Sequence, residues 1–174
     1  VELPMRENPK RFLIGVRGGF THSLKELMGA RVGVDVSVNL RAGPVMLWLS
    51  ALVQGGLASQ AVSDASGSLT SQSQLYFLPL QGRLAAELWA GRRLSVLLGA
   101  SGGATWAMYT TTLTGLTSVA WGPSAGAFAG LNIAAGPGHL FLEAGYTWAP
   151  VAGVGFRVET GGVHVAAGYR LGLF

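Results

Sequence analysis

Apolar and polar residues alternate with a period of two along most of the chain. In residues 29–40, Val32, Val34 and Val36 occupy one parity, whereas Arg31 and Asp35 occupy the other. Successive side chains of a β-strand point to opposite faces, so this pattern predicts a strand with one apolar and one polar face. The charged residue between the valines therefore belongs to the polar face, and the valines require an apolar environment on the other side.

The same alternation recurs between turn signals and divides the chain into eight predicted strands. They span residues 11–22, 29–40, 45–56, 74–89, 94–109, 118–135, 139–149 and 162–174. The connections alternate between short, Gly- or Pro-bearing turns (41–44, 90–93 and 136–138) and longer loops (23–28, 57–73, 110–117 and 150–161). Short and long connections then lie at opposite ends, as in an antiparallel up-and-down arrangement.

The alternative architecture is a helical membrane protein. Residues 94–142 contain no Asp, Glu, Lys or Arg, and hydropathy alone would permit one or two transmembrane helices there. The 27 glycines, the many Val and Thr residues, and the period of two in the other segments favour strands instead.

The composition places this sheet in a membrane. Only 11% of the residues are charged, 49% are hydrophobic, and the mean hydropathy is +0.42, so a water-soluble surface would be hard to assemble. A closed barrel leaves no unpaired strand edge in lipid. We therefore predict an all-β fold: an eight-stranded antiparallel up-and-down transmembrane β-barrel over residues 11–174, preceded by a periplasmic tail over residues 1–10.

The polar faces of the predicted strands carry the ionisable residues. Since eight strands enclose a space that side chains fill, we expect these residues to form a charge network in the lumen. The predicted network consists of Arg17, Arg31, Asp35, Arg83, Glu87, Glu143, His164 and Arg170, and Arg11 shares their parity. A proton or ion path along the same residues is one alternative, and a slim water-filled cavity or a ligand pocket that opens toward one end is another.

Aromatic residues of the apolar parity gather near the long-loop ends of the strands. They are Phe20, Tyr76, Trp106, Trp121, Tyr146 and Trp148. Aromatic girdles mark the membrane interfaces of barrels, so these side chains are predicted to lie at one interface.

On these features the chain resembles the small eight-stranded outer-membrane proteins of Gram-negative bacteria, the OmpA and OmpX type of barrel. The resemblance covers residues 11–174 and includes the ending "AAGYRLGLF" with its terminal aromatic residue, although Gly172 stands where a bulky residue is usual. It implies an outer-membrane location with periplasmic termini, contact with outer-membrane lipids and lipopolysaccharide, and insertion by the barrel-assembly machinery.

The functional prediction is a structural, envelope-anchoring or surface-interaction protein with a periplasmic or cell-surface protein partner. A narrow channel or transporter and a lipid A-modifying enzyme are the alternatives. His22, Ser23 and Glu26 form the best-placed trio for hydrolysis, but their spacing does not match a lipid deacylase, and we predict no enzymatic activity. No metal-ligand spacing and no cofactor motif is present, the chain has no cysteine, and the scattered basic residues do not indicate nucleic-acid binding.

Overall fold

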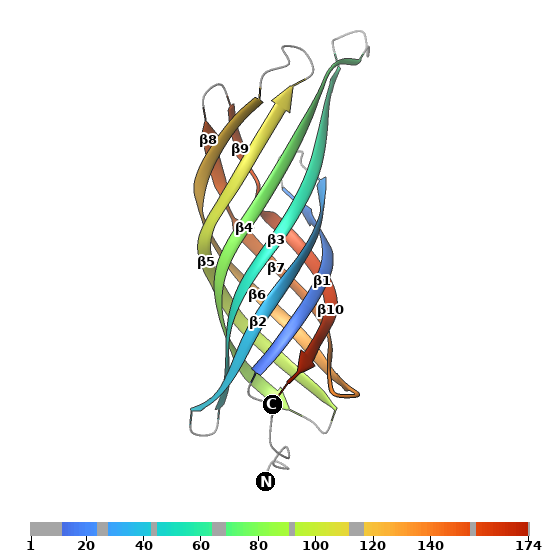
Figure 1. Ribbon diagram of the computed structural model, residues 1–174, viewed down its shortest axis with the longest axis vertical. Coiled ribbons are helices and arrows are strands. Elements are labelled where there is room, and N and C mark those ends of the chain that lie inside the picture. The colour runs from blue at the N-terminus through green and yellow to red at the C-terminus, as the bar shows by residue number, and fades with distance from the viewer. Residues whose placement is uncertain are drawn as a thin grey trace.

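The computed structural model describes residues 12–23, 28–42, 45–63, 69–90, 93–111, 117–153 and 156–173. Eight long strands close into a single antiparallel barrel, and a small hairpin stands beside it (Figure 1). The barrel strands are β1 (Phe12–His22), β2 (Met28–Ala42), β3 (Val45–Ser63), β4 (Leu69–Ala90), β5 (Leu94–Thr111), β6 (Thr117–Ala135), β7 (Gly138–Trp148) and β10 (Gly162–Gly172). The hairpin consists of β8 (Pro150–Gly153) and β9 (Phe156–Glu159).

Each barrel strand pairs with its neighbours along the chain, and β1 pairs with β10 from Leu13↔Gly172 to His22↔Val163. This pairing closes the sheet and confirms the predicted fold class. The helical alternative is wrong, since residues 94–142 form β5, β6 and part of β7. The described residues contain no helix with the length and hydropathy needed to cross a membrane.

Two of the predicted long loops are wrong in extent. β3 continues to Ser63 and β4 begins at Leu69, so most of residues 57–73 is paired strand, with partners such as Ser59↔Gln74. Residues 150–161 contain the β8–β9 hairpin. Residues 57–73 are rich in Ser and Gln, carry Asp64 as their one charged residue, and lack the alternation that marks a half-buried strand. Backbone pairing between strands needs no such pattern. The predicted tail over residues 1–10 and Arg11 lie outside the described residues.

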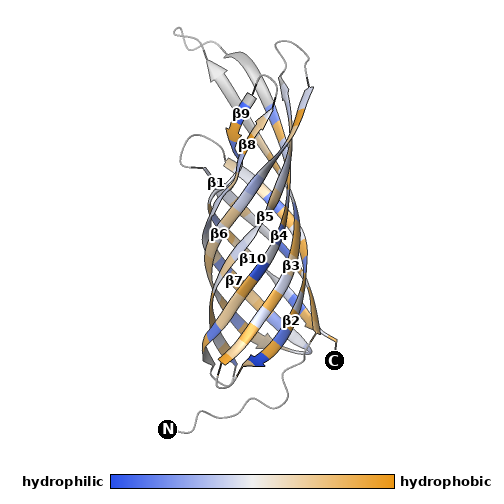
Figure 2. Cartoon of the chain, turned by 90° about the vertical axis from the view of Figure 1, so that its left-hand side faces the viewer, coloured by the Kyte–Doolittle hydropathy of each residue, from blue (hydrophilic) through white to orange (hydrophobic). Residues whose placement is uncertain are grey.

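The two faces of the barrel differ sharply in exposure. In β2, Val32 and Val34 are 70% and 51% exposed, whereas Asp35 and Ser37 are fully buried. Figure 2 shows hydrophobic and hydrophilic residues interleaved along each strand. The outer surface is therefore an apolar band suited to lipid, and the polar parity faces inward.

The two ends of the barrel have different architectures. The connections β2–β3, β4–β5 and β6–β7 lie at the end that also holds Phe12 and Gly172, which we call the short-turn end (Figure 1). The β6–β7 turn is tight because Gly136 adopts a left-handed conformation with φ of 57°. At the opposite end, which we call the hairpin end, β3 to β6 extend beyond the other strands and the β8–β9 hairpin stands close to them (Figure 1).

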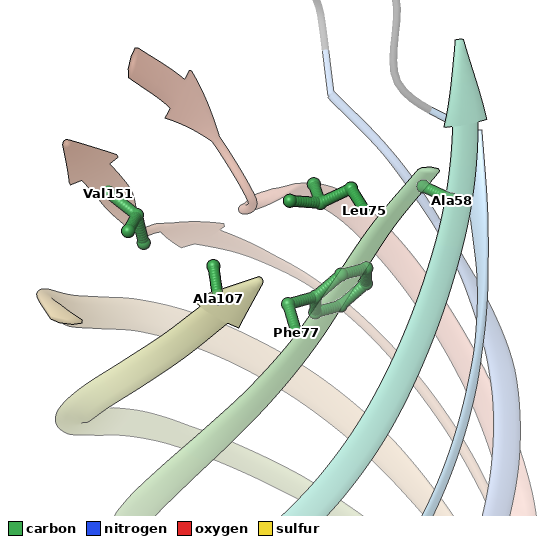
Figure 3. Packing of buried hydrophobic residues seen from close by; sticks show 5 residues of the cluster. All are labelled: Ala58, Leu75, Phe77, Ala107 and Val151. Carbon is green, nitrogen blue, oxygen red and sulfur yellow. The ribbon is translucent and has the colours of Figure 1, made fainter. Parts of the chain in front are cut away.

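The β8–β9 hairpin is fastened at its base and packs on the barrel. The Glu159 carboxylate accepts hydrogen bonds from the backbone N–H groups of Ala149 (2.6 Å) and Gly161 (3.1 Å). Gly122 of β6 lies directly against the Pro150 carbonyl, where any Cβ atom would overlap it. Val151 is fully buried in an upper apolar cluster with residues of β3, β4 and β5, namely Ala58, Leu75, Phe77 and Ala107 (Figure 3).

Three inward phenylalanines lie flat against glycines on the adjacent strand. Each pair is directly opposite in register: Gly56↔Phe77, Gly99↔Phe128 and Gly168↔Phe141. A Cβ atom on each of these glycines would lie less than 3 Å from a carbon of the facing ring, closer than van der Waals contact allows. The glycines thus leave the space in which the rings lie along the barrel wall, and the rings cover the bare backbone in return.

This packing predicts different outcomes for two glycines of the same sheet. Gly56→Ala forces the Phe77 ring away from the wall, and we expect it to destabilise the barrel by about 1–3 kcal/mol. Gly82 faces outward, and a Cβ atom added there would lie 3.8 Å from the Gly102 carbonyl oxygen, an ordinary contact, so Gly82→Ala should be neutral or stabilising by up to about 1 kcal/mol. Urea unfolding in lipid vesicles measures both.

Phe77→Leu tests whether the Phe77 ring causes the cost of Gly56→Ala, because the smaller leucine side chain makes room for the added methyl group. The cost of Gly56→Ala should shrink in the Phe77→Leu background. An unchanged cost would mean that the ring is not what the new methyl group meets.

Candidate functional site

The lumen is the part of the structure with a concentration of polar chemistry, and Glu143 lies at its centre. The Glu143 Oε1 atom accepts a hydrogen bond from Arg17 Nη2, and Oε2 is paired with Arg83 Nη2, both at 2.6 Å. His164 Nε2 lies 3.9 Å from Oε1. All of these side chains are buried or nearly so, and one carboxylate from β7 therefore joins arginines of β1 and β4 across the barrel.

A second ionic group lies nearer the short-turn end. Arg170 Nε donates to Asp35 Oδ2 at 2.8 Å, and Arg170 Nη1 donates to Asn132 Oδ1 at 3.3 Å. Ser37 Oγ donates to the same Asp35 oxygen at 3.0 Å. Asp35, on β2, thus pairs with an arginine of β10, and the group fastens the two strands that flank β1.

Arg31 is bonded differently from the other lumen arginines. Its Nη2 atom donates to the Thr160 carbonyl at 2.7 Å and to Thr21 Oγ1 at 3.1 Å. Both acceptors are neutral oxygens, although the guanidinium is buried. Arg31 therefore ties β2 to the chain that leaves the β8–β9 hairpin, and its charge has no hydrogen-bonded carboxylate among the described residues.

The arginines also stack on the phenylalanines that cover the glycines. Arg31 lies 5.0 Å from the centre of the Phe77 ring, Arg83 lies 3.7 Å from Phe128, and Arg170 lies 4.0 Å from Phe141. The same arrangement therefore occurs at three places in the lumen. In each, a phenylalanine packs on a glycine of the neighbouring strand, and a guanidinium group lies over the ring. Cation–π attraction adds to the hydrogen bonds in holding these arginines.

Apolar side chains lie on both sides of the central charges. The upper cluster described above lies toward the hairpin end, and a lower cluster of Leu13, Trp48, Ala85, Leu97 and Phe128 lies toward the short-turn end. Between them, a small cavity with room for roughly one water molecule is lined by Arg17, Arg31, Leu52, Gln54, Gln81, Arg83, Ser101, Phe128, Glu143, Thr147 and His164. The lumen is therefore a packed interior.

The predicted lumen residues fall into separate groups in the structure. Arg17, Arg83, Glu143 and His164 are together, Asp35 and Arg170 form the second group, and Arg31 lies toward the hairpin end. Glu87 lies apart from these, where its carboxylate accepts a hydrogen bond from Trp48 Nε1 at 3.2 Å.

Sequence reasoning did not find Thr21 and Thr160 as partners of Arg31, nor the stacking role of the phenylalanines. The signal available was the presence of Phe77, Phe128 and Phe141 on the charged parity, opposite glycines.

The predicted interface aromatics all lie on the outer parity. Phe20 and Trp121 are 68% and 58% exposed, Trp148, Tyr146 and Tyr76 are also exposed, and Trp106 is half-buried beside Trp121 in register. Their depth in a bilayer stays a prediction.

Of the hydrolytic trio, His22 is exposed and Ser23 is buried, while Glu26 lies outside the described residues. The described residues contain no cluster of His, Cys, Asp and Glu that could hold a metal ion.

No protein-family model and no curated protein matches the chain. Among solved structures, Neisserial surface protein A is similar over 93% of this chain and 97% of its own, with 15% identity and a TM-score of 0.56. Ail, the attachment invasion locus protein of Yersinia pestis, is similar over 92% of this chain and 97% of its own chain, with 12% identity and a TM-score of 0.45. A de novo designed transmembrane β-barrel is similar over 96% of this chain and 98% of its own chain, with 17% identity and a TM-score of 0.40. The chain has the fold of the small eight-stranded outer-membrane β-barrels.

The position of Glu143 predicts a large effect of neutralising it. Glu143→Gln leaves Arg17 and Arg83 without their shared carboxylate in a buried site, and we expect a loss of about 3–5 kcal/mol in the free energy of unfolding. Glu87→Gln is the matched control. Glu87 is half-buried and lies outside the Glu143 group, and a Gln side chain there can still accept the hydrogen bond from Trp48 Nε1, so we expect a loss of about 1 kcal/mol or less. Equal costs for the two variants, measured by urea unfolding, would argue against Glu143 as the centre of the network.

Proposed function

We propose that this chain is an outer-membrane scaffold with a sealed lumen, which holds surface hairpins for contact with other molecules or cells. The observation that carries the proposal is the filled interior: buried ion pairs lie between two apolar clusters, and the cavity among them has room for roughly one water molecule. A continuous path for solutes would require removing several of these side chains. The narrow-channel alternative has no comparable support.

The shape of the hairpin end supports a contact function. β3 to β6 extend as a tall wall on one side of the barrel, and the β8–β9 hairpin packs beside them (Figure 1). Rigid strands that continue beyond the apolar band present their connecting loops at a fixed place, which is how scaffolds commonly display binding loops. The similar Neisserial protein is named as a surface protein, which agrees with this proposal.

The proposed orientation places the short-turn end in the periplasm and the hairpin end outside the cell. Outer-membrane barrels have short periplasmic turns and longer extracellular loops, and the connections of this barrel divide in the same way. In this orientation the outer surface of the barrel contacts outer-membrane lipids and lipopolysaccharide, and the hairpin end faces protein partners. No step of the proposal requires catalysis or a cofactor.

The sealed lumen predicts that the purified protein forms no stable channel in a planar bilayer. A variant that carries Trp48→Ala and Phe77→Ala removes a large side chain from each apolar cluster and should raise the conductance above that of the unchanged protein. Reproducible channels from the unchanged protein would contradict the scaffold and favour the narrow channel.

The orientation is tested by labelling single cysteines, since the chain has none of its own. Thr117→Cys at the start of β6, where the side chain is exposed at the hairpin end, should react with a membrane-impermeant maleimide in intact cells. Ala42→Cys at the end of β2 should react only after the outer membrane is permeabilised. The reverse pattern would place the hairpin end in the periplasm and remove the basis for surface contact.

A further inference from the structure

The small cavity at the centre of the lumen has an excess of positive charge. Its lining includes three arginines, Arg17, Arg31 and Arg83, but one carboxylate, Glu143. The lining therefore holds two more guanidinium groups than carboxylates. Burying charge without compensation is costly, so a site of this kind gains free energy from an anion.

Some N–H groups of the same arginines have no hydrogen-bond acceptor among the described residues. Arg17 Nε and Nη1 and Arg31 Nε are buried and have no partner among the described residues. The Arg17 side chain is only 1% exposed, so bulk water does not satisfy these N–H groups. Guanidinium groups donate and cannot accept, and the group that completes them must therefore be an acceptor.

We infer that this cavity binds a small monovalent anion, chloride under physiological conditions. Size selects the ligand class: a space for roughly one water molecule admits a halide and excludes sulfate, phosphate and carboxylates of organic acids. Leu52 and Phe128 complete the wall with apolar surface, which suits a weakly hydrated ion held by arginines on one side.

The position of the cavity assigns the anion a structural role. The two apolar clusters lie on either side of the cavity along the barrel, so an ion in it would contact the interior side chains of the fold. It would neutralise Arg31, whose Nη2 hydrogen bonds go to neutral oxygens, and so support the link from β2 to the hairpin base at Thr160. This inference goes beyond the surface role and does not depend on it.

The test is urea unfolding in lipid vesicles, in sodium chloride and in sodium gluconate of equal ionic strength. Urea is used because guanidinium chloride would itself supply the anion, and gluconate is too large for the cavity. A ligand that binds only the folded state lowers the unfolding constant in proportion to its concentration above its Kd. We therefore expect a roughly tenfold lower unfolding constant for each tenfold rise in chloride in that range, and no such trend in gluconate.

Arg31→Gln should abolish the chloride dependence, because it removes one of the two excess charges and the unpaired Nε donor. Arg157→Gln is the matched control, since Arg157 is exposed on β9, and this variant should keep the full dependence. Equal unfolding constants in the two salts for the unchanged protein, or full chloride dependence in Arg31→Gln, would overturn the inference.

If Arg31→Gln does not fold, the anion can be detected directly in the unchanged protein. Crystals grown in sodium bromide should show an anomalous scattering peak inside the cavity, within contact of Arg17 and Arg31. Density for water alone at that place, without an anomalous peak, would overturn the inference.

Discussion

The narrow interior of an eight-stranded barrel is the constraint on which the rest of this structure depends. Eight strands enclose a space that side chains can just fill, and lipid outside prevents polar groups from turning outward. Every inward residue must therefore find its hydrogen bonds and counter-charges across the lumen. Glu143, which pairs with arginines of two other strands at 2.6 Å, meets this requirement and at the same time links strands that are not neighbours in the sheet.

The faces of the strands could be predicted from the sequence because lipid and lumen select opposite residue types. Val34 and Asp35 are adjacent in the chain, and the structure places them on opposite sides of the wall. Alternation gives the face of a residue, but it does not give its partner. Arg17 and Glu143 are 126 residues apart, and only the closed topology and register bring them together. The division of the lumen charges into separate groups was for this reason not predictable.

The extent of the strands toward the hairpin end was not predictable for a related reason. Where water lies on both sides of a sheet, either face can be polar, and the Ser- and Gln-rich residues 57–73 carry no alternation. Their pairing is a property of the backbone and continues from the strands below. The β8–β9 hairpin is similarly set by contacts that no local pattern reveals, including the close approach of Pro150 to Gly122 and the burial of Val151.

The choice of arginine over lysine in the lumen follows from the combination of tasks that each cation performs. Arg83 places its guanidinium 3.7 Å from the centre of the Phe128 ring and donates to Glu143 at the same time. A planar guanidinium can stack with its face and donate with its edge, whereas a lysine ammonium has neither geometry. Among the described residues, the four buried cations of the lumen, Arg17, Arg31, Arg83 and Arg170, are all arginines. Replacing any of them by lysine would keep the charge but lose the stacking that holds the phenylalanine against its glycine.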